Sequence, residues 1–274
     1  RRLSDTVMKL ICENTALEVE VSGSGYPTLI IHGFTGSASA MRPLSERLPG
    51  RKIVPDLVGH GRSESPASLD AYYLENICQQ LSSLLHQLEA SPASIVGYSL
   101  GGRIALNFAL THPGMVRSIA LIGASPGIRG KDDRLNRKNS DSELANSISQ
   151  RGVEEFIDAW VAMPMWESLR DKLTADQWQE SITQRRSNHS LGLANSLRAN
   201  GTGSMNPLHD ILGDLKAPTL LIAGDQDYKF LEIAYEMSDK IPDVSVEAIV
   251  DSGHAAHLEQ PDATANAIIR HFSC

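Results

Sequence analysis

The chain has 274 residues, of which 41% are hydrophobic and 21% charged, so it is long enough for one large α/β domain or two small ones. Its formal net charge of -8 at pH 7 gives no reason to expect a nucleic acid or an acidic membrane surface as a partner. The composition is ordinary for a globular enzyme, and we expect a small-molecule partner.

Short apolar runs separated by turn residues mark the strands expected in the first half of the chain. Residues 17–21 alternate apolar and polar side chains, as a half-buried strand does. The run at 28–31 is continuously apolar, which is typical of a central parallel strand covered on both faces. Further strands are expected at 53–56, 94–96 and 119–122. Residues 1–7 precede Met8, a natural-looking start, and we expect them to lie outside the fold.

Helical spacing of apolar residues predicts helices over 74–88 and 104–110. From 125 to 210 the chain is rich in charge, Asn and Ser, with helical patches at 153–161 and 177–182 and no convincing strand. Strand patterns return afterwards and a last helix follows, at 219–223, 245–250 and about 262–271.

Strands that alternate with helices predict the α/β class, with a mostly parallel central sheet, flanking helices and right-handed crossovers. The change of texture divides the chain into a core segment at 8–124, a helical lid insertion at 125–210 and a second core segment at 211–274. We expect the insertion to cover the carboxyl ends of the strands, where ligands bind in such sheets.

The cysteines and the apolar runs bear on location. Cys12, Cys78 and Cys274 are odd in number, scattered and without metal-ligand spacing, which suits a reducing compartment and argues against a disulfide framework. No apolar run in the sequence reaches the roughly 18 residues of a membrane span, and no signal-peptide pattern is visible. We therefore predict a cytoplasmic enzyme.

Ser99 stands in the pattern Gly-x-Ser-x-Gly, between an apolar run and a helix-compatible run. Such a serine sits on a tight strand-to-helix turn, where flanking glycines let the backbone pass close to itself. The turn also places Ser99 at a helix N-terminus, which favours negative charge. The pentapeptide alone also fits a glycine-rich turn with an incidental serine, so the rest of the chain has to supply the catalytic partners.

A catalytic serine needs a histidine within hydrogen-bond reach and an acid that orients the histidine. His254 follows one late strand, and Asp225 and Asp227 follow another. Each of these residues alone is more often a solvated loop residue, but the order Ser, Asp, His at strand ends is one known for such triads. We choose Asp227 as the acid, expect Asp225 to hold the turn, and interpret His257 as structural or pocket-lining.

The negative charge that develops in such reactions needs backbone donors, which form an oxyanion hole. The N–H of Leu100, directly after the serine, is one expected donor. The N–H of Phe34, in the loop after the strand at 28–31, is the expected second donor. The pair His32-Gly33 is the usual lead-in to that loop.

Four motifs spread over nearly the whole chain resemble the α/β-hydrolase superfamily. They are His32-Gly33-Phe34, Asp56 with Gly59-His60-Gly61-Arg62-Ser63, Gly97-Tyr98-Ser99-Leu100-Gly101-Gly102-Arg103, and Gly253-His254. The superfamily contains esterases, C–C hydrolases and some lyases, so the resemblance implies the fold and the triad without fixing the reaction.

Finer features resemble the 2-succinyl-6-hydroxy-2,4-cyclohexadiene-1-carboxylate synthases, lyases of menaquinone and phylloquinone biosynthesis that eliminate pyruvate from an enolpyruvyl precursor. These features are Tyr98, Arg103, Arg137, Trp160, Arg185 to Asn188, Asp227 to Phe230, and Gly253 to Glu259. The resemblance implies substrate-binding roles for Tyr98, Arg103, Arg137, Trp160 and Arg186. It also implies proton abstraction by the triad without an acyl-enzyme, and whether Ser99 is itself the base stays open.

Arginine behind the serine separates this branch from an ordinary esterase, whose pocket is largely apolar. An arginine at that place favours a carboxylate ligand. We therefore expect Arg103 to face the site and Arg137 and Arg186 to turn inward, although arginines of an insertion usually lie on solvated helix faces. The sequence predicts a small polycarboxylate substrate, with no metal and no organic cofactor.

Two other functions stay open. The main alternative is a serine hydrolase, either a carboxylesterase or a C–C bond hydrolase of small acidic substrates. A ligand receptor with a degenerate hydrolase fold is the other, and the complete set of triad residues argues against it. Arginines that face the site distinguish the lyase from the hydrolase.

Overall fold

The computed structural model describes residues 6–273 and is built on an eight-stranded sheet. The strands are β1 (Thr6–Cys12), β2 (Thr15–Ser22), β3 (Pro27–Ile31), β4 (Arg51–Pro55), β5 (Ala93–Tyr98), β6 (Val116–Ile122), β7 (Thr219–Gly224) and β8 (Val244–Ile249). Their spatial order is β1-β2-β4-β3-β5-β6-β7-β8. Strand β2 pairs antiparallel with β1 and β4, and the other pairs are parallel, so the predicted mostly parallel sheet is confirmed.

The middle of the sheet is apolar because helices cover both of its faces. Ile30 and Ile31 of β3 and Ile95 and Val96 of β5 have no exposed surface. Neighbouring residues of one strand point to opposite faces, so a continuous apolar run is needed where both faces are covered. This is why β3, β5, β6 and β7 were recognisable in the sequence.

Strand β1 corrects one expectation from the sequence. The strand begins at Thr6 and pairs Thr6 with Val21 and Val7 with Glu20, so residues 6 and 7 belong to the sheet and do not lie outside the fold. Residues 1–5 lie outside the residues that the structure describes. The sequence did not predict this strand because it forms the edge of the sheet, where Val7 is 52% exposed and Ile11 is 62% exposed. Cys12 is buried and Met8 and Leu10 are partly buried on the opposite face, so the strand has no continuous buried run.

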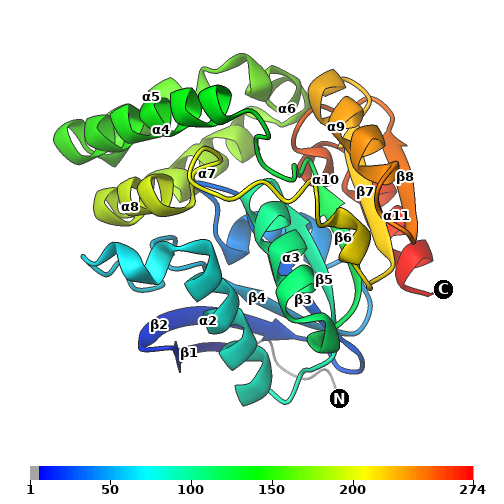
Figure 1. Ribbon diagram of the computed structural model, residues 1–274. Coiled ribbons are helices and arrows are strands. Elements are labelled where there is room, and N and C mark those ends of the chain that lie inside the picture. The colour runs from blue at the N-terminus through cyan, green and yellow to red at the C-terminus, as the bar shows by residue number, and fades with distance from the viewer. Residues whose placement is uncertain (1–5, 274) are drawn as a thin grey trace.

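Helices cover the two faces of the sheet as separate layers (Figure 1). One face is covered by α2 (Leu74–Gln87), α3 (Leu100–Thr111) and α9 (Tyr228–Ser238). The other face is covered by α1 (Arg42–Ser45), α10 (Ala256–Glu259) and α11 (Pro261–Phe272). Short 3-10 helices lie at Ala38–Met41, Leu69–Tyr72, Pro113–Met115, Pro164–Trp166 and Leu212–Asp214. The result is a three-layer α/β/α arrangement with an apolar core on each side of the sheet.

Between β6 and β7 the chain forms a helical insertion, residues 125–210, that we propose as the lid. Its helices are α4 (Lys131–Arg151), α5 (Val153–Val161), α6 (Glu167–Lys172), α7 (Ala175–Arg186) and α8 (Ser190–Asn200). The insertion has a small core of its own around the fully buried Ile148, Ile157 and Leu193. Figure 1 shows α4, α5, α7 and α8 grouped above one edge of the sheet.

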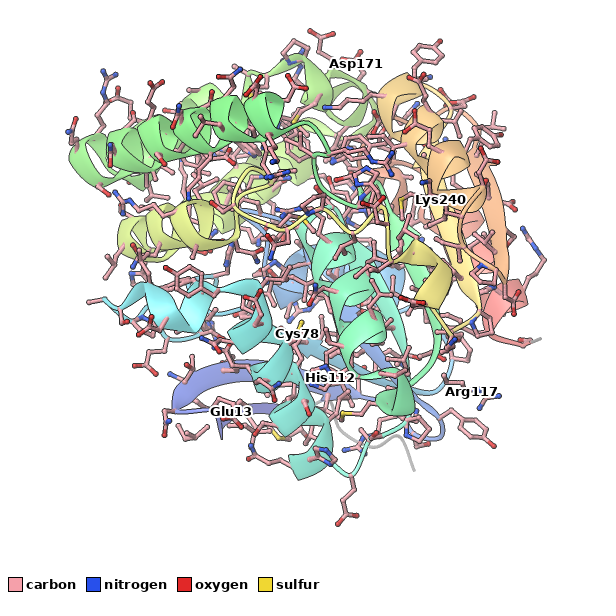
Figure 2. The ribbon with its side chains drawn as sticks, in the orientation of Figure 1. Glu13, Cys78, His112, Arg117, Asp171 and Lys240 are labelled. Carbon is pink, nitrogen blue, oxygen red and sulfur yellow. The ribbon has the colours of Figure 1, made fainter. Side chains whose placement is uncertain are left out.

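Figure 2 shows the extent of the molecule from that insertion to the far side of the sheet, with Asp171 of α6 at one end and Glu13 of the β1–β2 turn at the other. Cys78 lies on α2, and both Cys78 and Cys12 are buried free thiols, while Cys274 is outside the described residues. Within residues 6–273, no helix has the length and apolar character that crossing a membrane requires.

Candidate active site

Ser99 occupies a strained turn between β5 and α3. Its φ is +52°, which a non-glycine residue rarely adopts. A Cβ atom on Gly97 would lie 2.4 Å from the carbonyl oxygen of Gly101, and one on Gly101 would lie 2.2 Å from that of Ile31. Only glycine fits at both positions, so the motif lets α3 start directly against the strands. The turn leaves Ser99 half-buried at the carboxyl end of β5.

The loops after β7 and β8 bring two more side chains to the serine. His254 Nε2 lies 3.2 Å from Ser99 Oγ, and His254 Nδ1 lies 2.7 Å from Asp227 Oδ2. Because the carboxylate accepts the Nδ1 hydrogen, Nε2 is left as the acceptor for the serine hydroxyl. Asp225 instead accepts a hydrogen bond from the backbone N–H of Ser252, at 3.2 Å. The arrangement is able to remove a proton from Ser99, or from a substrate through it.

Glu259 holds the histidine loop from behind and was not singled out in the sequence. Its carboxylate accepts hydrogen bonds from the backbone N–H groups on both sides of His254, at Gly253 (2.7 Å) and Ala255 (3.2 Å). It also accepts a hydrogen bond from the hydroxyl of Ser168 in α6. The buried Glu259 therefore fixes the backbone that carries His254 and ties it to the insertion.

Two backbone N–H groups beside Ser99 are without an acceptor. Among the hydrogen bonds of residues 6–273, none uses the N–H of Leu100 or of Phe34. Leu100 is the first residue of α3, where the free N–H groups and the helix dipole both favour an anion. These are the two donors expected from the sequence, and both are available to hold an oxyanion.

The loop that carries Phe34 is fixed by buried polar groups. Asp56 accepts hydrogen bonds from the N–H groups of Ala38 (2.6 Å) and Arg62 (2.7 Å). His32 donates from Nδ1 to the carbonyl of Gly33 (2.8 Å) and accepts at Nε2 from the N–H of Leu57 (3.0 Å). Burial lowers the pKa of His32 to about 4, so its ring stays neutral and keeps this donor and acceptor pair.

Tyr98 and His257 pack behind the triad. The Tyr98 ring lies 4.2 Å from the ring of His257 and 5.5 Å from that of His254, centroid to centroid. Burial raises the pKa of Tyr98, and its buried hydroxyl has no hydrogen-bond partner within residues 6–273. Burial, followed by the neighbouring His254 and Arg185, lowers the pKa of His257 to about 3. Both groups are therefore neutral near pH 7.

Arg103, which we expect to face the site, is buried on α3 behind the serine. Its Nη1 and Nη2 both donate to the carbonyl oxygen of Asn200, at 3.1 Å, and so hold the C-terminal end of α8. Burial, and then the positive charge of Arg137, lower the pKa of Arg103 to about 10. No ion pair within the described residues includes Arg103. Its guanidinium therefore has a structural contact and no direct ion pair, and the nearby carboxylate of Asp141 stabilises its charge.

The structure places Arg185, and not Arg186, against the active-site loop. Arg185 is only 6% exposed, its Nη1 lies 2.6 Å from Thr35 Oγ1, and its guanidinium carbon lies 4.4 Å above the ring of Trp166. The side chain of Arg186 is 38% exposed and forms an ion pair with Asp158. The expectation that Arg186 turns inward is wrong, because consecutive residues of a helix point about 100° apart and α7 directs the earlier arginine to the sheet.

Arg137 and Trp160 complete the residues expected from the sequence. Arg137 is 46% exposed and its Nε donates to the buried Asp141, one helical turn away, so it lies at the rim of the inward face of α4, where its charge acts on Arg103. Trp160 contacts Phe34 edge to face at 5.6 Å, and its buried Nε1 has no partner among the described residues. Trp160 thus belongs to the insertion core and also to the wall beside the oxyanion loop. No cluster of three metal-ligating side chains occurs within residues 6–273.

Comparison with known proteins gives consistent relatives. Residues 26–261 match the family described as alpha/beta hydrolase fold. A Bacillus subtilis (strain 168) protein, provisionally named 2-succinyl-6-hydroxy-2,4-cyclohexadiene-1-carboxylate synthase, is 34% identical over 84% of this chain and 84% of its own length. The synthase of that name from Klebsiella pneumoniae subsp. pneumoniae is 29% identical over 87% of this chain and 91% of its own length. The structure of MenH from S. aureus matches with a TM-score of 0.87 and 28% identity, over 93% of this chain and 97% of that chain.

Proposed function

This chain belongs to the alpha/beta hydrolase fold family, in the branch of its Bacillus subtilis relative, and from that premise we propose that it is a lyase that eliminates pyruvate. The proposed substrate is 2-succinyl-5-enolpyruvyl-6-hydroxy-3-cyclohexene-1-carboxylate, and the product is 2-succinyl-6-hydroxy-2,4-cyclohexadiene-1-carboxylate, an intermediate of menaquinone and phylloquinone biosynthesis. Ser99, His254 and Asp227 serve as the proton-abstracting triad.

The observation that carries this proposal is the unpaired buried charge of Arg185. No ion pair within residues 6–273 includes it, and its contacts are a hydroxyl and an aromatic ring. A buried guanidinium without a carboxylate is costly, so a ligand that brings a carboxylate gains a strong, charge-assisted contact. Thr35, which Arg185 contacts, is next to Phe34 in the chain, so that carboxylate is held close to the proposed oxyanion donors. The substrate carries carboxylates on its ring, its succinyl chain and its enolpyruvyl group.

The triad geometry accounts for the proton transfer. His254 Nε2 accepts the hydroxyl proton of Ser99, and Ser99 takes a proton from the ring carbon next to the succinyl carbonyl. The negative charge moves to the carbonyl oxygen, where the N–H groups of Phe34 and Leu100 stabilise the enolate. The electron pair then forms a double bond to the adjacent ring carbon, the existing ring double bond shifts by one position, and the enolpyruvyl group leaves as the bond between its oxygen and the ring carbon breaks. Protonation of that group gives pyruvate.

The reaction moves a proton and a leaving group, so the chemistry calls for no metal or organic cofactor. We also propose that the enzyme works in the cytoplasm, which the use of free, buried cysteines at Cys12 and Cys78 supports.

A serine hydrolase of small acidic substrates is the second candidate, because the same Ser99–His254–Asp227 contacts and the same backbone donors serve hydrolysis. In that reaction Ser99 attacks a carbonyl carbon, and water later releases the acyl group. The two candidates share the triad and differ in whether water takes part.

Supplying the enolpyruvyl precursor and following pyruvate with lactate dehydrogenase tests the proposal. We expect pyruvate release that is lost in Ser99→Ala, together with poor turnover of a neutral p-nitrophenyl ester, which has no carboxylate for Arg185. Rapid ester turnover with no pyruvate release would overturn the lyase and support the hydrolase.

A further inference from the structure

The loop that carries the proposed oxyanion donor contains a strained turn. Gly36 N–H donates to the carbonyl of Gly33 at 3.0 Å, which closes a four-residue turn with Phe34 and Thr35 in the middle. Thr35 has a φ of +64°, whereas Phe34 is not among the residues with positive φ. A positive φ at the third position alone defines a type II turn, and that position normally requires glycine. The chain places a β-branched threonine there.

Two side chains of the insertion hold Thr35, which has no exposed surface. Asn188 Nδ2 donates to the carbonyl oxygen of Thr35 at 2.9 Å. Arg185 Nη1 donates to the hydroxyl of the same residue at 2.6 Å. The polar groups of Thr35 are thus bound from the insertion side, and these bonds compensate for the unfavourable backbone conformation.

Asn188 itself is held rigidly. It is 4% exposed, and besides Thr35 its Nδ2 donates to the carbonyl of Arg185 at 2.9 Å, while its Oδ1 accepts from the N–H of Gly61 at 2.8 Å. Both amide hydrogens face carbonyls and the amide oxygen faces an N–H group, which fits one orientation of the amide. Asn188 therefore joins the end of α7 to the Phe34 loop and to the loop after β4.

We propose that Asn188 is a positioning residue that keeps Thr35 in the left-handed conformation and so keeps the Phe34 N–H directed at the oxyanion. Without the Nδ2 bond, the strain at Thr35 is released by a shift of the turn backbone towards negative φ, and Phe34, the neighbouring residue of the same tight turn, shifts with it. The donor residue then moves away from the place where charge develops. This inference rests on the proposed role of Phe34, and it makes the insertion part of transition-state stabilisation.

The test compares Asn188 variants in the parent chain, where Thr35 is strained, with an Asn188 variant in a Thr35→Gly chain, where the strain is removed. Asn188→Ala and the equally sized Asn188→Asp both remove the donor to Thr35. Each variant is expected to lower kcat at least about tenfold and to leave KM little changed. Loss of a whole oxyanion donor typically lowers kcat by about 10²–10³-fold. Thr35→Gly makes the positive φ free of strain. In the Thr35→Gly background, Asn188→Ala is expected to lower kcat less than about threefold.

Asn195→Ala is the matched control. Asn195 is also a buried asparagine of the insertion and also binds backbone carbonyls of the loop after β4, those of Pro66 (3.2 Å) and Ala67 (3.4 Å), but it does not touch the Phe34 turn. We expect a kcat close to that of the parent chain. Equal losses of kcat in the Asn188 and Asn195 variants, or a loss in the Asn188 variants that Thr35→Gly does not relieve, would overturn the inference.

The rate at which a fluorophosphonate phosphonylates Ser99 gives a second readout that does not depend on the lyase reaction. Ser99 Oγ attacks phosphorus, fluoride leaves, and the phosphoryl oxygen occupies the oxyanion hole. If the parent chain releases no pyruvate but Asn188→Ala slows labelling at least about tenfold, the proposed function fails and the inference stands. If the parent chain releases pyruvate and the Asn188 variants leave both kcat and labelling unchanged, the function stands and the inference is wrong.

Discussion

The carboxyl edge of the sheet and the helical insertion contribute different things to the site. The sheet supplies the reacting groups, because Ser99, Asp227 and His254 each lie on a turn directly after a strand. The insertion supplies Arg185 and Asn188, which touch the loops of the sheet without belonging to the triad. Under the proposed function, the sheet provides the groups that make and break bonds, and the insertion provides the positive charge that binds the substrate.

Both regions also contain buried side chains that lack a partner within residues 6–273. His254 and Asp227 satisfy each other within the fold. Arg185 remains a buried cation without a counter-ion, and the hydroxyl of Tyr98 and the Nε1 of Trp160 have no partner within residues 6–273. Tyr98 belongs to β5, and Arg185 and Trp160 belong to the insertion, so both regions contribute buried groups without a partner, as expected where a ligand completes a site.

The largest effect is expected from the sheet side. Ser99→Ala and His254→Ala should each lower kcat by about 10³ or more, and the double variant should be little worse than either single one, because the triad acts as a unit. Single-turnover measurements of pyruvate release check this. Additive losses would show that the two residues act in different steps, which contradicts the proposed mechanism.

On the insertion side, the two adjacent arginines provide a sharp contrast. Arg185→Ala should lower kcat/KM about tenfold to a hundredfold, because a charge-assisted contact is worth about 1.5–3 kcal/mol. Arg186→Ala is the matched control, and it should stay within about twofold because Arg186 pairs with Asp158 at the surface. Steady-state kinetics on the proposed substrate decides between them. A larger loss for Arg186→Ala would mean that the insertion rearranges when the ligand binds.

A smaller effect concerns acid stability, which we expect to come from the sheet side. Burial, followed by the neighbouring His32, lowers the pKa of His60 to about 3, whereas an unfolded histidine titrates near 6.5. Between these values the unfolded chain binds a proton that the folded chain does not, so the free energy of unfolding falls as the pH is lowered.

The variant His60→Gln should therefore reduce the slope of unfolding free energy against pH by about 1.4 kcal/mol per pH unit near pH 5. Urea unfolding at several pH values between about 4.5 and 6, inside the window from about 3 to about 6.5 that the two pKa values define, measures both slopes. Identical slopes in the two proteins would show that His60 is protonated equally in the folded and unfolded states.

The sequence predicted the structure where a local requirement of the backbone or of strand packing determines which residues can occupy a position. The glycines around Ser99 are required by close backbone contacts, so the motif predicts the turn. Asp227 and His254 were found because parallel strands end at one edge of the sheet, which brings their loops together. The edge strand β1 was missed because one-sided packing leaves no continuous apolar run.

The insertion was harder to predict, for a physical reason. Which of Arg185 and Arg186 faces the sheet depends on the rotation of α7 about its axis, and charged residues around that helix leave its phase undefined in the sequence. Asn188 acts through bonds to backbone groups far along the chain, at Thr35 and Gly61, and such partners follow from tertiary packing alone. Asn188 stood within a motif of the synthase branch, but its partner Thr35 was not identifiable.

The central claim is that this hydrolase-type triad performs an elimination, and isotope incorporation tests it most directly. Turnover of the enolpyruvyl precursor in oxygen-18 water separates the two reactions, because hydrolysis places a solvent oxygen in a new carboxylate, whereas elimination only moves a proton and expels pyruvate. The ketone of pyruvate exchanges its oxygen with water afterwards, so the ring product is the diagnostic species. The proposed lyase predicts a ring product without label, and labelled oxygen in a newly formed carboxylate would contradict it.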